Sequence, residues 1–365
     1  MDHISASIMA HPQRQERAEQ LAADLNAEGI EARVALDPAP QLAPSAVRCL
    51  NIALSQAGSS QYHVVLHDDV VVASNFRQSL QSMIYFSRQV APSRLMVGLF
   101  AEWSSRSGQS VRYAALMGSP LASLVDGVVP CAGVLLDSEL AYELSDLVAT
   151  NVQSGATRDG KLLWSLAHQV GVTPLLSVPS LVQHDVLGSV SQWELSRVTR
   201  GMRRAACYTG EGTLVDDTER SARAARAALD LEEVVYISSR SLFAEHSLRA
   251  TRESEFVSEL AFEWLVKNEL GGAPAVAQAL EAYASAIKER LPHLSKVFAI
   301  QVAAMLMGTS KLLPSDLIRD AEIARKALAT VVPGAVRQIL EVDNEALMGA
   351  TAPELFLDII RDYTG

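Results

Sequence analysis

The sequence has few cysteines, no long apolar run and a deficit of positive charge, and each shortage excludes a class of protein. Three cysteines, Cys49, Cys131 and Cys207, have neither zinc-site spacing nor the even number of a disulfide framework. No segment approaches the roughly 20 apolar residues of a membrane helix, and the N-terminus lacks the features of a signal peptide. We therefore expect a cytoplasmic protein without a membrane span.

The charge balance also limits the partners. Lysine and arginine total 31 against 42 acidic residues, and the resulting net charge of −11 argues against general nucleic-acid binding. The apolar fraction of 49% is that of an ordinary globular protein, and 365 residues exceed what one core usually supports. Two domains are therefore expected.

The first half of the chain alternates short apolar runs with amphipathic stretches, which predicts a mostly parallel sheet flanked by helices. Ligands of such sheets bind beyond the carboxyl ends of the strands. The expected strands lie within 4–10, 32–36, 62–66, 93–100, 111–117 and 127–136, and the expected helices within 14–29 and 45–58 and from about 76, 138 and 159 onward.

The second half changes to helical patterns separated by glycine and proline, with EEVVYISS as its one ambiguous segment. The simplest division is a mixed domain at 1–212 and an all-α domain at 213–365. Apolar helix faces in the second domain suggest that it recognises the acceptor of a transferred group or forms a homodimer.

Three segments contain candidate functional groups, and the first is HDDV. Asp68 and Asp69 follow the apolar run YHVVL, so they are expected at the end of a strand. Paired carboxylates there supply the hard oxygen ligands that Mg²⁺ or Mn²⁺ prefers, with phosphates and water completing the shell. The structural alternative is a solvated turn or a helix cap.

The other two segments are VPSLVQHDVLGS and SGATRDGKLLWSLAHQVG. His184, in the first, is either a structural histidine or an imidazole ligand for a metal. Asp159, in the second, opens a helix, where it is either a cap or a base toward an acceptor hydroxyl.

Taken in order, these segments resemble the GT-A glycosyltransferases over about residues 4 to 200. In many members of that family a Pro-Ser-x-x-x-His segment supplies a metal-binding histidine. The resemblance implies a GT-A, Rossmann-like fold and does not reach the helical half. It is carried by IMAHPQR, by the Asp-Asp motif after VVL, and by CAGVLLDSELA, RDGKLLW and PSLVQH.

The resemblance also implies roles for individual residues. Asp69 and His184 would bind the metal, Asp68 would touch the ribose or share the metal, and Asp159 would be the catalytic base. His67 departs from the family, which often has a carboxylate at that position. The residues implied on the nucleotide side are Ala10, His11, Pro12 and Arg14, with Arg48 and Asn51 approaching from the next helix.

The function expected from this resemblance is transfer of a sugar from a nucleotide-diphosphate sugar to an unidentified acceptor, a small molecule, glycan or peptide, with Mn²⁺ or Mg²⁺ as cofactor. One alternative is a GT-A-like binding scaffold that has lost turnover. Another is a nucleotidyltransferase, although the loop MAHPQRQER has no glycine to cradle phosphates. The fold by itself decides none of these.

Overall fold

The structure is a computed structural model of the chain. It describes residues 3–42, 45–90, 94–153, 158–185, 204–212, 218–231, 233–238, 247–252, 258–269, 272–336 and 352–364.

The chain forms two compact units, each assembled from three segments. The first unit comprises Met1–Ala101, Ser123–Ser196 and Tyr208–Thr218, and the second comprises Glu102–Ala122, Arg197–Cys207 and Glu219–Gly365. The expected division was a single cut after residue 212, beside residues 213–217, which lie outside the described part of the chain. The second unit instead includes Glu102–Ala122 and Arg197–Cys207, which precede the expected boundary. A chain that ended at residue 212 would therefore contain these two segments without the rest of the second unit.

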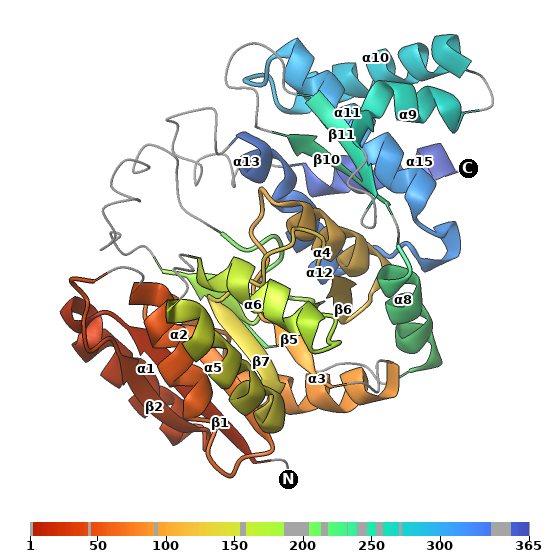
Figure 1. Cartoon of the computed structure of the whole chain (residues 1–365). Coiled ribbons are helices and arrows are strands. Elements are labelled where there is room, and N and C mark those ends of the chain that lie inside the picture. The colour runs from red at the N-terminus through yellow and green to blue at the C-terminus, as the bar shows by residue number, and fades with distance from the viewer. Residues whose placement is uncertain are drawn as a thin grey trace. The chain divides into compact units, whose positions relative to one another are not determined.

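A seven-stranded sheet has the strand order β2-β1-β3-β7-β5-β8-β6 (Figure 1). Strand β1 is parallel to β2 and β3, and β5 is parallel to β8, whereas β7 is antiparallel to both β3 and β5. The expected α/β class is confirmed, and this mixed sheet is compatible with a Rossmann-like core. The strands are β1 (Ile4–Ala10), β2 (Glu31–Leu36), β3 (Tyr62–His67), β5 (Met96–Gly98), β6 (Leu121–Ser123), β7 (Gly133–Asp137) and β8 (Leu175–Ser177).

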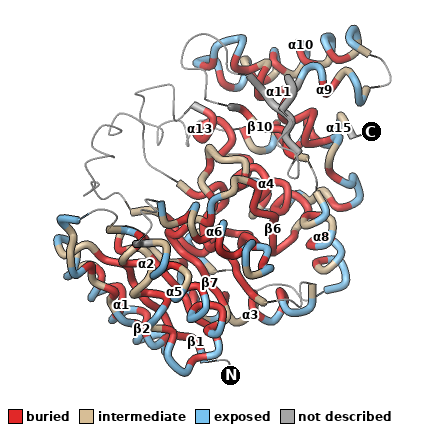
Figure 2. The backbone as a smooth tube through the Cα atoms, viewed as in Figure 1, coloured by how far each residue is buried: buried red, intermediate tan, exposed pale blue. Residues whose placement is uncertain are grey.

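Helices flank the sheet, and the strands β1, β3 and β7 form the buried centre of the first unit (Figure 2). Helix α1 packs on β1 and β2, and α2 packs on β1 and against α5. The predicted apolar face of α1, from Ala18 to Leu25, is the buried one. The helices of this unit are η1 (Pro12–Arg14), α1 (Gln15–Ala27), α2 (Ser45–Ser55), α3 (Phe76–Val90), α5 (Ser138–Gln153) and α6 (Asp159–Gln169).

The second unit is not all-α, which corrects the expectation. It contains an antiparallel sheet of β10 (Glu233–Ser238), β11 (Ser247–Arg252) and β12 (Ser258–Leu260). Its helices are α4 (Arg106–Met117), α8 (Glu219–Leu229), α9 (Ala261–Lys267), α10 (Gly272–Arg290), α11 (Lys296–Leu312), η3 (Ser315–Leu317), α12 (Glu322–Ala329), α13 (Val331–Val336) and α15 (Pro353–Thr364). Among the described helices of the whole chain, none combines the length and apolarity needed to cross a membrane.

The strand expected at 111–117 is wrong, because these residues belong to helix α4. Ser105 caps the helix by accepting the N–H of Gly108 at 2.8 Å, and Gly118 ends it in the left-handed conformation at φ 71°. Every residue from Ser107 to Met117 is buried. A helix covered on all sides has no polar face, so its sequence lacks the 3.6-residue periodicity of a surface helix.

Arg112 is a buried cation of α4 that joins three parts of the second unit. Its guanidinium donates to the Trp103 carbonyl at 2.6 Å, to the Thr330 carbonyl at 3.0 Å and hydroxyl at 3.1 Å, and to Gln109 at 3.2 Å. Burial lowers the pKa of Arg112 to about 10, so the group is still charged at neutral pH. Loss of the guanidinium would leave several buried acceptors without donors.

Arg112→Met should therefore destabilise the second unit by at least about 2 kcal/mol, because each orphaned acceptor keeps its desolvation cost. Urea unfolding of the full chain measures the change. The control is Lys296→Met, which breaks an exposed ion pair with Glu281 and should cost less than about 1 kcal/mol. Equal effects of the two substitutions would contradict a central role for Arg112.

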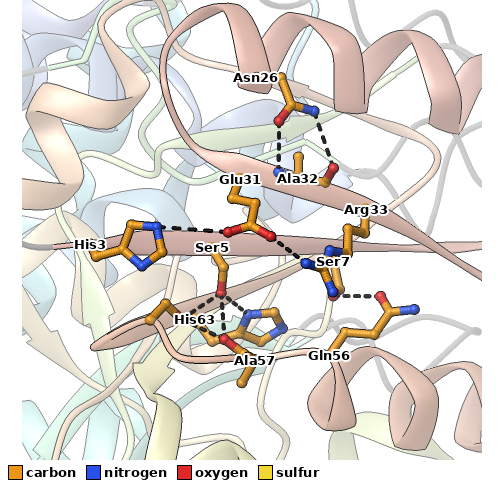
Figure 3. A network of polar contacts seen from close by, with 12 residues as sticks. His3, Ser5, Ser7, Asn26, Glu31, Ala32, Arg33, Gln56, Ala57 and His63 are labelled. Carbon is orange, nitrogen blue, oxygen red and sulfur yellow. Dashed lines mark hydrogen bonds and ion pairs between the residues drawn. The ribbon is translucent and has the colours of Figure 1, made fainter.

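A buried polar network connects the first residues of β1 and β3 to helix α2 (Figure 3). Ser5 Oγ lies 2.7 Å from both His63 Nδ1 and Ser60 Oγ, and Ser60 Oγ lies 3.0 Å from Ser138 Oγ. His63 Nε2 lies 2.9 Å from the Ala53 carbonyl, which can only accept, so Nε2 carries the hydrogen. Burial lowers the pKa of His63 to about 4, and the folded protein therefore holds this imidazole neutral.

The depressed pKa of His63 makes the stability of the sheet depend on pH. The unfolded chain takes up a proton near pH 6.5 and the folded chain only near pH 4, so the contribution is complete above pH 6.5 and is lost as the pH falls toward 4. The expected loss is about 3 kcal/mol. Native-state hydrogen exchange of β1 and β3 amides measures it. His63→Gln should remove this dependence, whereas His3→Gln, at an exposed histidine, should retain it.

Candidate functional site

The paired carboxylates lie where the sequence predicted, at the carboxyl end of a strand. Strand β3 ends at His67, and Asp68 and Asp69 form the turn that leads into β4 (Val70–Val72). Strands β1 and β3 are parallel, with Met9 opposite His67, and the Asp68 N–H donates to the Met9 carbonyl at 3.1 Å. The loop after β1 therefore lies beside Asp68 and Asp69, at the carboxyl end of these two parallel strands.

Both carboxylate oxygens of Asp68 already have partners. Oδ2 accepts the backbone N–H of His11 at 3.0 Å, and Oδ1 accepts a hydrogen bond from Arg14 Nη1 at 3.0 Å. The Asp68 side chain is only 9% exposed. In this arrangement Asp68 anchors the loop His11–Arg14, and direct ligation of a metal would require it to give up one of these contacts.

Asp69 faces two imidazoles and a guanidinium. Its Oδ2 lies 3.2 Å from Arg14 Nη1, and its Oδ1 lies 3.5 Å from His184 Nδ1 and 3.9 Å from His67 Nδ1. Oδ1 is buried and receives no hydrogen bond. An anionic oxygen without a donor, facing two ring nitrogens, is in a position where a cation or proton is favourable.

A short two-stranded sheet brings His184 to Asp69. Strand β9 (Val182–His184) pairs antiparallel with β4, with His184 opposite Val70. The next residue, Asp185, donates its N–H to the Asp69 carbonyl at 2.8 Å. The ring of Phe100 packs edge-on against His184, with centroids 4.9 Å apart. The sequence predicted that these two segments contribute to one site, and the structure brings them together.

Asp159 also belongs to this cluster, through His67. It is the first residue of α6, where its Oδ1 accepts the Gly160 N–H at 2.7 Å and its Oδ2 lies 3.5 Å from His67 Nε2. At that length the imidazole contact is electrostatic rather than a well-formed hydrogen bond. Arg158, not Asp159, occupies the N-cap position. Asp159 is therefore held by His67 as well as by the helix start.

Gly160 permits the close packing beside Asp159. The N-terminal turn of α6 lies against the loop at Val129, and the Val129 N–H donates to the Gly160 carbonyl at 3.0 Å. A Cβ atom at position 160 would lie 2.3 Å from the Val129 carbonyl oxygen, so a larger residue would push the loop away.

The charges of the cluster influence one another. Burial would raise the pKa of Asp69, but contact with His184 and the charges of His67 and Arg14 hold it below its usual range. Burial would likewise lower the pKa of His67, but Asp159 above all raises it, and His67 in turn lowers the pKa of Asp159. Both carboxylates are thus ionised at neutral pH, with His67 favoured as a cation between them.

The side chains of this cluster are partly exposed, although the Asp69 Oδ1 and His67 Nε2 atoms themselves are buried. The side chains of Asp69, His67, Asp159 and His184 are 24%, 29%, 22% and 15% exposed. Within the described residues, no group of three or more His, Cys, Asp or Glu side chains is already arranged as a metal site. Asp69 and His184 nevertheless fit a hard cation with two protein ligands. Their 3.5 Å separation is slightly longer than the roughly 3 Å between neighbouring ligands of an octahedral ion.

Two of the expected nucleotide-side residues have other contacts. Arg48 donates through Nε and Nη2 to Asp37, each at 3.2 Å, and also to the carbonyls of Ala39 and Leu42. The carbonyl and side-chain oxygens of Asn51 accept from Ser145 of α5. These contacts join Arg48 to the segment after β2 and Asn51 to helix α5, rather than to the carboxylate cluster.

The loop after β1 is closer to the expectation. Ala10 ends β1 and Pro12 opens η1, while the His11 side chain accepts the Gln13 N–H at 3.2 Å. Asp37, which follows β2, was missed by the sequence analysis. It is buried, and its N–H donates to the Ala10 carbonyl at 3.1 Å. An acid directly after the run ARVAL was the available signal, the same one that identified Asp68 and Asp69.

Neither the cysteine near this site nor the buried Ser5–His63 pair has the properties of a nucleophilic centre. Burial and the charge of Asp159 raise the pKa of the Cys131 thiol well above its usual value, so no reactive thiolate forms. The Ser5–His63 pair is fully buried, at the opposite ends of β1 and β3 from Asp68. The accessible chemistry is therefore that of carboxylates and imidazoles.

No protein-family model matches this chain, and no curated protein matches it significantly. The geometry of the site is therefore the basis for the functional argument.

The two adjacent acids should differ in their roles. Asp69→Asn should weaken Mn²⁺ binding by at least about tenfold, because it removes the anionic oxygen that faces His184. Asp68→Asn should mainly lower the melting temperature, because it loosens the loop that contains His11 and Arg14. Free Mn²⁺, measured by electron paramagnetic resonance, and thermal unfolding separate the two effects. Equal losses of Mn²⁺ binding in the two variants would contradict this division.

Proposed function

We propose that the protein is a metal-dependent glycosyltransferase, which moves a sugar from a nucleotide-diphosphate sugar to an acceptor hydroxyl. One observation supports this most strongly: a chain of contacts at the carboxyl end of β3 runs from His184 to Asp69, and through His67 to Asp159. The combination of a possible metal position with a separate carboxylate suits group transfer from a diphosphate. The proposal includes the GT-A architecture that the sequence resembles.

Asp69 and His184 are the residues that would hold Mn²⁺ or Mg²⁺. When bound, such an ion neutralises the charge that develops on a leaving diphosphate. Asp68 would fix the loop His11–Arg14, whose backbone and guanidinium would face the nucleotide. These roles agree with those that the resemblance implies for Asp69 and His184, and they make Asp68 an anchor.

Asp159 would act on the acceptor. As the acceptor oxygen forms its bond to the sugar carbon and the diphosphate oxygen leaves, the hydroxyl proton passes to an oxygen of Asp159. The low pKa of Asp159, lowered by His67, keeps it ionised and ready to accept, but also makes it a weak base. Proton transfer should therefore occur late, after bonding to the sugar has made the hydroxyl acidic.

The second unit would bind the acceptor or a second copy of the chain. Its helices α11 and α15 pack together around buried residues such as Phe298 and Phe356, so the unit has a core of its own. A small molecule, a glycan and a peptide are all acceptors that fit this proposal.

A turnover assay tests the proposal against its alternatives. The full chain is incubated with a panel of nucleotide-diphosphate sugars and Mn²⁺, and release of the nucleoside diphosphate is measured with water as the surrogate acceptor. Slow, Mn²⁺-dependent release from one donor is expected. Binding without release would indicate a scaffold, and release of pyrophosphate from a nucleoside triphosphate and a sugar phosphate would indicate a nucleotidyltransferase.

Asp159→Asn tests the assignment of the base. The amide occupies the same volume but does not take up a proton at neutral pH, so the rate should fall by about 10²- to 10⁴-fold. Donor affinity should stay near the parent value, because Asp159 does not hold the donor. The control is Asp137→Asn, which lies opposite the first residue of β3, at the other end of that strand from Asp68, and whose carboxylate binds Arg88. A rate near that of the parent for Asp159→Asn would favour a mechanism without this base.

A further inference from the structure

Arg14 is the cation that lies between the two acids of the motif. A single nitrogen, Nη1, lies 3.0 Å from Asp68 Oδ1 and 3.2 Å from Asp69 Oδ2. The Arg14 side chain is only 10% exposed, so solvent screens these contacts weakly. The guanidinium thus supplies positive charge to the same carboxylate that would bind a metal.

This position creates a conflict between Arg14 and a divalent cation. A metal on Asp69 would stand close to a buried guanidinium that shares the same carboxyl group, and like charges repel strongly where water is excluded. Asp68 offers Arg14 a second anchor, which it keeps if the contact with Asp69 is broken. A planar guanidinium also has several donors and matches the geometry of phosphate oxygens.

We propose that Arg14 is the internal counter-ion of the metal-free site and changes partners when substrate binds. In the metal-free protein it neutralises Asp68 and Asp69 together. When the metal and a diphosphate enter, Arg14 leaves Asp69 to the metal, stays on Asp68, and donates to the diphosphate oxygens. Both the metal on Asp69 and the identity of the second ligand as a diphosphate rest on the proposed function, whereas the contacts of Arg14 with Asp68 and Asp69 do not.

The exchange predicts an order of affinities. The metal alone binds weakly, because it must displace Arg14 without giving that cation a new anion. The metal together with a diphosphate binds better, because the diphosphate accepts the released guanidinium. The protein would therefore favour the metal–diphosphate complex over the free ion.

Arg17, in the first turn of α1, provides a matched control for Arg14, which is the N-cap residue of that helix. It lies one turn beyond Arg14, and its Nη2 pairs with Asp185 rather than with the acids of the motif. Substitution of Arg17 removes an equal charge from the start of α1 without removing the competitor at Asp69. The difference between variants at positions 14 and 17 therefore isolates the specific contact.

The test measures Mn²⁺ binding to the full chain by electron paramagnetic resonance, without any nucleotide. Arg14→Gln should tighten Mn²⁺ binding by about tenfold, within the usual range for linked binding events. Arg17→Gln should change it much less. Unchanged or weaker Mn²⁺ binding in Arg14→Gln would overturn the competition, as would the absence of Mn²⁺ binding in both the parent and this variant.

The second arm uses pyrophosphate at saturating Mn²⁺, followed by calorimetry. Arg14→Gln should weaken pyrophosphate binding by about tenfold, and Arg17→Gln should not. Equal pyrophosphate affinity in the parent and Arg14→Gln would overturn the transfer of Arg14 to phosphate. Because neither arm uses a nucleotide sugar or measures turnover, failure of the proposed glycosyl transfer would appear separately, in the donor assay.

Arg14→Lys keeps the test decisive if Arg14→Gln does not fold. Lysine retains the competing charge, so Mn²⁺ binding should remain near the parent value, while the loss of the planar donor set should weaken pyrophosphate binding. Tighter Mn²⁺ binding in Arg14→Lys, or pyrophosphate binding equal to that of the parent, would contradict the exchange.

Discussion

The arrangement of this site depends on the compensation of negative charge at the end of β3. Asp68 and Asp69 follow a buried strand, and charge removed from water is costly unless it is paired. The chain pairs it with Arg14 from the loop after β1 and with the imidazoles of His67 and His184. Charge pairing, together with the β4–β9 strand pairing, thus holds segments distant in sequence at the carboxyl end of β3.

That requirement also explains which parts of the site the sequence could predict. An apolar run followed directly by two acids is unusual, so the location of Asp68 and Asp69 at a strand end followed from the residues alone. The role of His184 beside Asp69 was implied by a resemblance and not by periodicity, and the pairing of β4 with β9 that brings the two together was not predicted. The contact of His67 with both Asp69 and Asp159 was not foreseeable, because its partners are 2 and 92 positions away along the chain.

The errors in the fold have physical causes as well. Helix α4 is buried on all sides, and its second half, VRYAALM, is apolar at most positions and therefore resembles a buried strand. Strand β11, with the sequence SLRATR, is short and has only Leu248 and Ala250 as apolar residues, so its alternation is too weak to predict a strand. Each unit is assembled from three separate segments of the chain. This division depends on packing between residues that are distant in sequence, so the composition along the chain does not predict it.

The most direct test of this account is calorimetric titration of the full chain with nucleoside diphosphates, in Mn²⁺ and again in excess chelator. The account predicts that at least one nucleoside diphosphate binds in Mn²⁺ and loses most of its affinity in chelator, because in the proposed function Asp69 and His184 would hold an ion that binds the diphosphate. Equal affinity with and without Mn²⁺, or no binding of any nucleoside diphosphate under either condition, would contradict it.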